Sequence, residues 1–390
     1  MLTRQGWALL VGAALTFLAA RLFGLVELFI VGAALVILAL VAVLYVHIVS
    51  PRLRVRRTLT PARVHAGDAA RVEVAATNIG NHRTPVLTLR DPVAGTRGAR
   101  LHLVPLRHAE RARAAYRLPT DRRGVVAIGP LTVEVQDPFG VARHRRAGAP
   151  RLELTVFPHV DVIMAPPGGG DRDPLGTAVH HRSIGRQGDE FYSLREYVVG
   201  DDLRRVHWRS TARNDELMVR QDEMPWQDRT TVVLDVRRAA HSEESIERAV
   251  SAAASVVTAA FRFQHHLRLV SSDGVDAGLG NSLGHVEAIM EYLATVDASG
   301  HGSLRGLLDR LRRSPQAGSL VAVLGKATKN ELEALASLRR SFGAVVVVVT
   351  DGAERPTTGN LPLAVVDARR DGTFAAGWAS MVGTPQEVRA

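Results

Sequence analysis

The first fifty residues contain two long apolar runs with very few polar positions. Residues 28–49 read LFIVGAALVILALVAVLYVHIV without a formal charge, and residues 7–20 are almost entirely apolar. A bilayer core needs about 20 apolar residues in a helix, so the longer run predicts a spanning helix. The shorter run reaches that length if it includes Gly6 and if Arg21 extends toward the lipid headgroups. Together the runs predict a transmembrane helical hairpin over residues 1–50.

The beginning of the chain also fits a second interpretation. Arg4 followed by a short apolar run, with Ala19 and Ala20 near its end, resembles a secretory signal. We favour the retained hairpin, because an immediate second span is uncommon after a cleaved signal. Positive charges lie before the first run and directly after the second, which predicts that both ends of the hairpin and the soluble domains face the cytoplasm of a multi-pass cell-membrane protein. An extracytoplasmic surface module with the opposite orientation is the alternative.

The residues that follow the hairpin alternate between arginine and apolar side chains. In a strand, Arg52, Arg54 and Arg56 would share one face, and Leu53 and Val55 the other. Juxtamembrane arginines attract anionic lipid at about 1 kcal/mol each, so we expect a lipid-facing group made of Arg52, Arg54, Arg56 and Arg57. An ordinary stop-transfer flank is an equally weighted alternative.

The charge is concentrated in the part of the chain next to this flank. Residues 51–165 contain 20 arginines against 9 acidic residues, whereas the net charge of the whole chain is +10. We expect no nucleic acid partner, because no aromatic residues are interleaved with the basic ones and no recognition-helix pattern accompanies them. The absence of cysteine excludes disulfides and thiolate metal sites.

Two patterns of soluble structure follow. Residues 51–165 consist of short alternating runs such as residues 131–135, separated by turn residues, which predicts an immunoglobulin-like β-sandwich. A glycine-rich linker opens the segment 166–228. From residue 229 to 390, continuous apolar runs alternate with helical stretches, which predicts an α/β domain with a mainly parallel sheet covered on both faces. The predicted strands are residues 230–235, 267–271, 320–324, 344–349 and 363–366. A ligand of that domain would bind at the carboxyl ends of these strands.

The segment between the two domains is unusually rich in charged and aromatic residues. Asp201 or Asp202 can cap a short helix after Gly200. We interpret the cluster first as an ion-pair network of Arg204 and Arg213 with these aspartates, joining the linker to the α/β domain. The alternative is a hydrolase in which His207 acts as acid or base, oriented by Asp201 or Asp202. No recognisable nucleophile motif supports that alternative.

The same segment carries a family resemblance. The pattern R-E-Y-x-x-G-D-D-x-R-x-x-H-W over residues 195–208, followed by S-x-A-R over residues 210–213, closely resembles the bacterial family catalogued as domain of unknown function 58. The resemblance implies two N-terminal spans, a β module and a C-terminal domain similar to von Willebrand factor type A domains. It also implies a scaffold or adaptor that binds a MoxR-type AAA+ ATPase, and no catalytic activity. The signature residues, expected to bind a partner or to stabilise the fold, are Arg195, Glu196, Tyr197, Gly200, Asp201, Asp202, Arg204, His207, Trp208 and Arg213.

A metal site of the von Willebrand type is incomplete in this sequence. Such a site presents Asp-x-Ser-x-Ser after the first strand, whose oxygens suit a hard cation. Asp235 is present, but Arg237 and Ala239 occupy the next two ligand positions. An arginine supplies no lone pair and adds positive charge where the cation would bind. We therefore expect no metal and no cofactor, with Asp235 as a degenerate candidate that caps the end of its strand.

Overall fold

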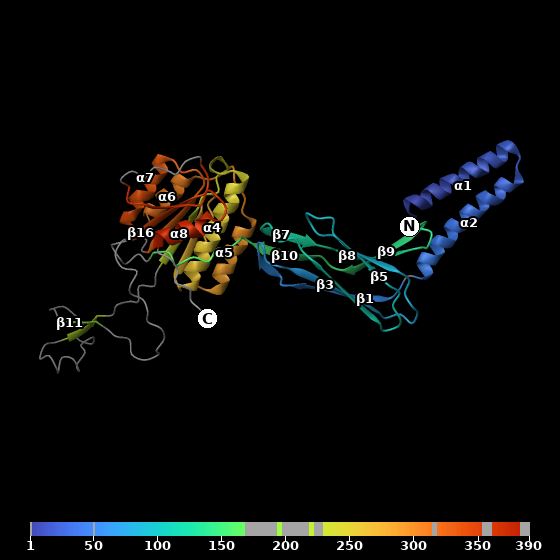
Figure 1. Ribbon diagram of the computed structural model, residues 1–390, viewed down its shortest axis with the longest axis horizontal. Helices are drawn as coiled ribbons and strands as arrows, with labels where there is room; N and C mark the ends of the chain where they lie inside the picture. Colours follow the sequence, from blue (N-terminus) through green and yellow to red (C-terminus); the bar gives the residue numbers. More distant parts are fainter. Residues whose placement is uncertain are drawn as a thin grey trace. The chain divides into compact units, whose positions relative to one another are not determined.

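The computed structural model describes residues 2–49, 51–167, 193–196, 218–221, 229–313, 318–352 and 361–382, the two short strands at 193–196 and 218–221 by their backbone. The chain divides into two compact units, Met1–His159 and Val160–Ala390 (Figure 1). The first unit contains the N-terminal helices and the antiparallel sheets, and the second contains the parallel sheet.

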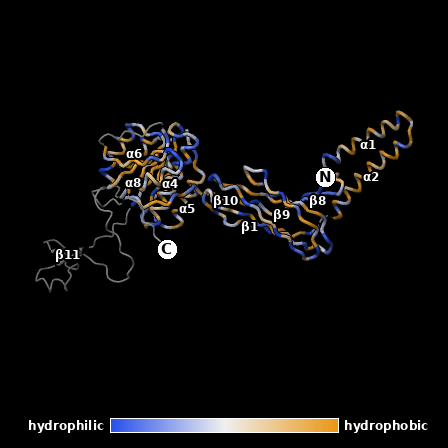
Figure 2. The backbone as a smooth tube through the Cα atoms, viewed as in Figure 1, coloured by the Kyte–Doolittle hydropathy of each residue, from blue (hydrophilic) through white to orange (hydrophobic). Residues whose placement is uncertain are grey.

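Two helices form the N-terminal hairpin. Helix α1 spans Arg4–Phe23 and α2 spans Val26–Ile48, and both are long and apolar enough to cross a membrane. Small residues are buried at seven-residue intervals on both helices, at Ala13 and Ala20 on α1 and at Gly32 and Ala39 on α2, and Gly32 lies against the Phe17 ring of α1. The large apolar side chains on the other faces are exposed, and apolar colours dominate this hairpin in Figure 2.

The rest of the first unit is a module of three sheets, which we call the β module. One sheet has the order β1-β3-β6, one β5-β4-β8-β9 and one β2-β10-β7. The core lies between the inward residues of the strands, for example Val72, Val74, Leu87 and Leu131. All pairs are antiparallel except β2 with β10. The bounds are β1 Leu53–Thr60, β2 Arg63–His65, β3 Arg71–Asn78, β4 Leu87–Asp91, β5 Ala99–Leu103, β6 Arg111–Arg117, β7 Gly124–Ile128, β8 Leu131–Gln136, β9 Arg143–Ala149 and β10 Leu152–Phe157.

The hairpin is attached to the β module at both of its ends. Thr3 caps α1, and its backbone N–H donates to Val141 O (2.9 Å) in the loop between β8 and β9, while its hydroxyl donates to Gly140 O (2.5 Å). Near the end of α2, Val46 is buried in the same hydrophobic cluster as the strand residues. The His47 and His144 rings lie 5.4 Å apart between their centroids. The N-terminus therefore lies at the same end of the β module as the start of β1.

One predicted lipid-facing residue is in the interior. Strand β1 alternates as expected, with Arg52, Arg54 and Arg56 exposed, but the Arg57 side chain is 1% exposed. Its guanidinium pairs with the buried Asp91 at 2.5 Å and also donates to Pro150 O. The expectation that Arg57 faces lipid was therefore wrong. The physical reason is the period of two: Arg57 is an odd-numbered position, on the face that packs against the core.

The second unit contains a five-stranded parallel sheet with the order β14-β13-β15-β16-β17. Helices α6 and α7 pack on one face of it, and α4 packs on the opposite face. Every predicted strand of this domain is present, whereas helix α8 was not predicted. The bounds are β13 Arg229–Leu234, α4 Glu243–Arg262, β14 His266–Ser271, α5 Leu283–Thr295, α6 Leu304–Arg313, β15 Ser319–Leu324, α7 Lys329–Ser337, β16 Ala344–Val349, β17 Ala364–Asp367 and α8 Thr373–Val382.

The second compact unit begins at Val160. Two hydrogen bonds hold this entering segment on the α/β unit: the Asp161 backbone N–H donates to Ser255 Oγ (2.9 Å), and the indole of Trp378 donates to Met164 O (3.0 Å). Trp378 is fully buried, so α8 contributes to the core that receives this segment.

Candidate functional site

The strand order places one crevice where open α/β sheets bind their ligands. Along the chain, β13 is followed by β14 on one side of it and then by β15 on the other, so the order reverses between β13 and β15. Ligands of such sheets bind at the carboxyl ends of the strands at this reversal. Asp235 directly follows β13 and Gly325 directly follows β15. We call the polar residues at this end of the sheet the strand-end site.

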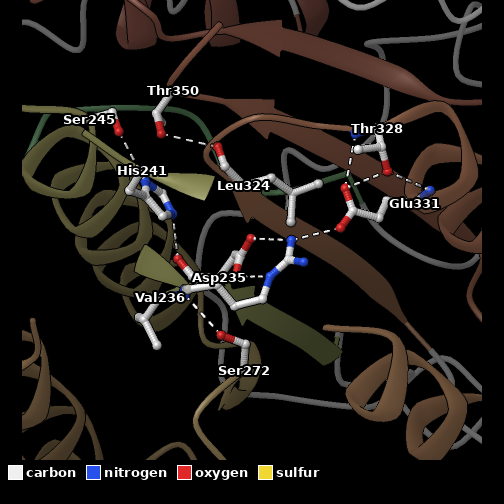
Figure 3. Close-up of polar contacts among 10 residues, drawn as sticks. Asp235, Val236, His241, Ser245, Ser272, Leu324, Thr328, Glu331 and Thr350 are labelled. Atoms are coloured by element: carbon white, nitrogen blue, oxygen red, sulfur yellow. Dashed lines mark hydrogen bonds and ion pairs between the residues drawn. The ribbon is translucent and has the colours of Figure 1, made fainter. Parts of the chain in front are cut away.

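Arg237 occupies the position that a bound cation would take at Asp235. Asp235 is 0% exposed, and its carboxylate accepts two hydrogen bonds from the guanidinium of Arg237, from Nε at 2.9 Å and from Nη2 at 2.8 Å (Figure 3). The Arg237 backbone N–H also donates to Asp235 Oδ1 (3.1 Å). Hydrogen bonding to Asp235, opposed by burial, raises the pKa of Arg237 above its usual value. The buried carboxylate is thus neutralised by a permanent charge within the same chain.

The same guanidinium connects β13 to the helix after β15. Arg237 Nη2 donates to Glu331 Oε1 at 2.7 Å. Glu331 is positioned by the capping box of α7, in which its Oε2 accepts from the backbone N–H of Thr328 (2.9 Å), and the Thr328 hydroxyl accepts from the Glu331 N–H (3.4 Å). One arginine therefore bridges the two elements that border the crevice.

A second group of polar residues lies beside this bridge, at the start of α4. The ring of His241 lies 2.7 Å from Asp235 O through Nε2 and 3.2 Å from Ser245 Oγ through Nδ1. Burial lowers the pKa of His241, although Asp235 opposes the effect, so the ring favours its neutral form. Ser242 caps α4 in a box with Ser245. Both serine hydroxyls therefore take part in the cap of α4.

Asp351, after β16, completes this group. Its carboxylate accepts from the Ser242 N–H (2.8 Å) and from the Gly352 N–H (2.6 Å). Burial alone would raise the pKa of Asp351, but hydrogen bonds from Ser245, Ser242 and Gly352 outweigh burial and lower it. The neighbouring Thr350 hydroxyl donates to Leu324 O (3.0 Å), which joins the ends of β15 and β16.

The sheet carries the same Asp-x-Arg arrangement a second time. At the end of the edge strand β17, Arg369 donates to Asp367 through Nε (2.9 Å), Nη2 (2.6 Å) and its backbone N–H (3.1 Å). The Asp367 side chain is 37% exposed, in contrast to the fully buried Asp235. Two strand-end aspartates therefore share one local geometry and differ in burial.

These contacts decide which chemistry the strand-end site supports. Both oxygens of Asp235 already accept from a guanidinium, and no group of three or more His, Cys, Asp or Glu side chains that could hold a metal occurs among the described residues. Sequence reasoning recognised that Arg237 opposes a cation, but it missed that Arg237 pairs with Asp235 and Glu331. An Asp-x-Arg directly after a buried strand is the signal that could have found the first of these pairs.

The signature residues mostly lie outside the described part of the chain. Arg195 and Glu196 belong to strand β11 (Ser193–Glu196), which pairs antiparallel with β12 (Met218–Gln221), with Arg195 opposite Val219. The remaining ones lie outside the described residues, so the network and hydrolase interpretations stay predictions: Tyr197, Gly200, Asp201, Asp202, Arg204, His207, Trp208 and Arg213.

Comparison with known proteins identifies the family. Residues 193–380 match the model of the family described as "Protein of unknown function DUF58". Residues 193–380 of this chain belong to the DUF58 family. The matched region contains the whole signature, all five strands of the parallel sheet and the strand-end site, so the site described above is a feature of the DUF58 region of this chain. No curated protein matches the chain.

Solved structures share only limited likeness with this DUF58 protein. The CARDB domain of the PF1109 protein from Pyrococcus furiosus is 20% identical, with 27% of this chain and 93% of that chain covered, at a TM-score of 0.23. The putative ApaA protein from Bordetella pertussis is 14% identical, with coverages of 27% and 94% and a TM-score of 0.20. The alkylpurine DNA glycosylase AlkC of Pseudomonas fluorescens is 10% identical, with coverages of 27% and 30% and a TM-score of 0.19. These TM-scores are too low for any argument about function.

Proposed function

We propose that this DUF58 protein is a membrane-anchored adaptor that binds a protein partner through the strand-end site of its α/β unit. The hairpin is the anchor, because two helices of 20 and 23 residues expose large apolar side chains that water solvates poorly. The positive charge of Arg4 at the start of α1, with the arginines after α2, favours a multi-pass orientation with both units in the cytoplasm. Within this proposal the β module is the immunoglobulin-like spacer and the α/β unit is the von Willebrand factor A-like recognition domain.

The observation that carries the binding role is the guanidinium bridge at the strand reversal. A crevice that holds a small ligand or a cation in other α/β folds is closed in this chain by Arg237, whose bonds to Asp235 and Glu331 use the groups that such a ligand would need. What remains is a polar surface with exposed charges of both signs, at Arg238, Glu243, Glu244, Lys326 and Lys329. Such a surface suits a protein partner, which it can recognise by charge complementarity.

The partner that the family resemblance implies is a MoxR-type AAA+ ATPase, and we propose no catalytic activity for the chain itself. The test uses the full chain in liposomes and the purified MoxR-type ATPase of the same organism, with flotation of the ATPase as the measure of binding. Arg238→Glu reverses an exposed charge at the strand-end site and is expected to weaken flotation about tenfold or more, as a complementary charge pair across an interface does.

The matched control is Arg262→Glu, an exposed arginine in the last turn of α4, at the amino-terminal edge of the sheet. This variant should float the ATPase as well as the wild type does. Equal loss in the two variants, or none in either, would place the binding surface elsewhere. ATP hydrolysis is measured on the ATPase alone and with the chain, which separates binding from activation.

The orientation has its own test. Alkaline phosphatase fused after Ala390 is expected to be inactive in cells, because the enzyme folds only outside the cytoplasm. Activity there would overturn the cytoplasmic placement and favour the extracytoplasmic alternative, without affecting the membrane anchor.

A further inference from the structure

The outer face of the β1-β3-β6 sheet has an uncompensated positive charge at one end. The register places Arg54 opposite Thr77 and Thr77 opposite Arg111, and the next outward row joins Arg56, Ala75 and Arg113. All four arginines are exposed, and the strand pleat places them on the outer face of the sheet. Within the described residues, none of the four forms an ion pair or a side-chain hydrogen bond.

The two arginines of β1 and the two of β6 lie on either side of β3. Neighbouring strands lie about 4.8 Å apart, so the β1 and β6 arginines are separated by about 10 Å, with β3 between them. The β3 side chains between them are the small ones of Thr77 and Ala75. This shape leaves room for an anionic group that the guanidinium groups can approach from two sides. We call Arg54, Arg56, Arg111 and Arg113 the arginine frame.

Several other arginines of the β module have internal partners, which the four arginines of the frame lack. The buried Glu134 on the neighbouring sheet lies within ion-pair distance of Arg90 (2.7 Å), Arg145 (3.2 Å) and Arg143 (3.5 Å). Farther along the outer face of the β1-β3-β6 sheet, Arg71 pairs with Glu73 at 3.1 Å. Those contacts explain these arginines by the fold alone, whereas no such contact explains the frame.

The frame lies at the end of the sheet next to the hairpin. Strand β1 begins at Leu53, shortly after α2 ends at Ile48, and Arg54 is its second residue. The bonds of Thr3 to Gly140 and Val141 hold the N-terminal end of α1 at the β module as well. An inserted hairpin would therefore hold the frame close to the headgroups of the leaflet from which the chain emerges.

We infer that the arginine frame binds the phosphate groups of anionic phospholipid headgroups in the membrane that holds the hairpin. This inference rests on the proposed membrane anchor and adds a specific lipid site to it. Four guanidinium groups around one small area carry a charge that zwitterionic lipid does not neutralise, and arginine binds phosphate through paired N–H donors. The site includes Arg111 and Arg113, which are distant in sequence from the hairpin, and it excludes the buried Arg57.

The test uses the full chain in nanodiscs of phosphatidylcholine and phosphatidylglycerol, with spin-labelled forms of each lipid. Electron paramagnetic resonance gives the fraction of each labelled lipid that the protein immobilises, and hence the selectivity for phosphatidylglycerol. At about 1 kcal/mol per arginine near the surface, Arg111→Gln/Arg113→Gln is expected to lower this selectivity about fivefold or more. The glutamines keep most of the side-chain length on an exposed face, and an unchanged melting temperature checks the fold.

The matched control is Arg71→Gln/Arg117→Gln. It removes the same charge from β3 and β6 on the same face, but about 14–20 Å farther from the hairpin, which exceeds the screening length. This control should retain the wild-type selectivity. Equal selectivity in the wild type and the frame variant, or equal loss in frame variant and control, would overturn the inference.

Two further arms separate the possible failures. Co-elution of the chain with nanodiscs tests the anchor alone, so a chain that co-elutes but shows no selectivity refutes the lipid site and not the anchor. In nanodiscs of phosphatidylcholine only, a labelled single-stranded oligonucleotide and inorganic phosphate serve as soluble anions. Frame-dependent binding of either one, with no lipid selectivity, would assign the frame to a soluble ligand and overturn the lipid site.

Discussion

Loss of the Arg237 guanidinium should destabilise the strand-end site, and the similar Asp367–Arg369 pair after β17 provides the control. Arg237→Met keeps a side chain of similar length and removes the guanidinium. The Asp235 carboxylate, 0% exposed, would lose the bonds at 2.9 and 2.8 Å, and Glu331 would lose the bond at 2.7 Å. Removal of one partner of a buried pair costs about 3–5 kcal/mol. Because the Arg237 side chain is 27% exposed and water can reach the vacated space, we expect about 2–4 kcal/mol.

The assay is hydrogen exchange of the full chain, followed in peptides from β13 and β15. A loss of about 2–4 kcal/mol speeds exchange there about 30- to 700-fold. Arg369→Met removes the same set of side-chain bonds from Asp367, which is 37% exposed, so it is expected to cost less than about 1 kcal/mol in β17. Equal losses in the two variants, or a loss below about 1 kcal/mol for Arg237→Met, would refute the argument that the burial of Asp235 sets the cost.

Three further predictions concern metal, pH and the β module. Millimolar Mg²⁺ should leave the melting temperature of the full chain unchanged, because Arg237 uses both oxygens of Asp235; a rise that Asp235→Ala abolishes would contradict this. Because burial lowers the pKa of His241, the unfolded chain takes up a proton first as the pH falls below about 6.5, so the stability of the α/β unit should decrease there. His241→Gln should flatten that decrease in melting curves, and parallel curves for the two proteins would count against it. Arg57→Met should destabilise the β module by about 3–5 kcal/mol, and Arg57→Met/Asp91→Asn should recover part of the loss in denaturant unfolding; no recovery would show that Asp91 is not the source of the cost.

Periodicity predicted the second unit well because its strands are buried on both faces. Runs such as residues 344–349 are continuously apolar, and a parallel sheet covered by helices requires this. Helix α8 was missed, because its sequence TFAAGWASMV has no start signal and contains a glycine. Its assignment depends on tertiary contact, since Trp378 is buried against the segment that contains Met164.

The β module was predicted less completely, for a physical reason that two strands share. Strands β6 and β9 read RARAAYR and RHRRAGA, and both lack the β-branched residues that favour strands. They pair because their neighbours supply the ladder, and β9 places Arg143 and Arg145 around the buried Glu134. Arg57 could have been predicted, because the alternation that places Arg54 and Arg56 outward places Arg57 inward. Its partner Asp91, 34 residues later, could not.

The sequence predicted where the strand-end site lies, but not which side chains pair within it. The rule for open α/β sheets indicates the carboxyl ends of the strands, and Asp235 lies there. The bridge to Glu331 depends on how α7 packs against the sheet, which no spacing of residues within one element encodes. The same limitation applies to the arginine frame, whose two halves are brought together only by the register of β1, β3 and β6.

The double attachment between the hairpin and the β module limits how the module can move. A single peptide connection after Ile48 would let the module swing, but the bonds of Thr3 to Gly140 and Val141 add a second attachment on the other helix. Because the two attachments are separated, they restrict rotation of the β module relative to the hairpin, and the two move as one body. A bilayer thinner than the helices tilts a hairpin of this kind. The module would tilt with it as a lever, and one edge of the module would move down toward the membrane surface.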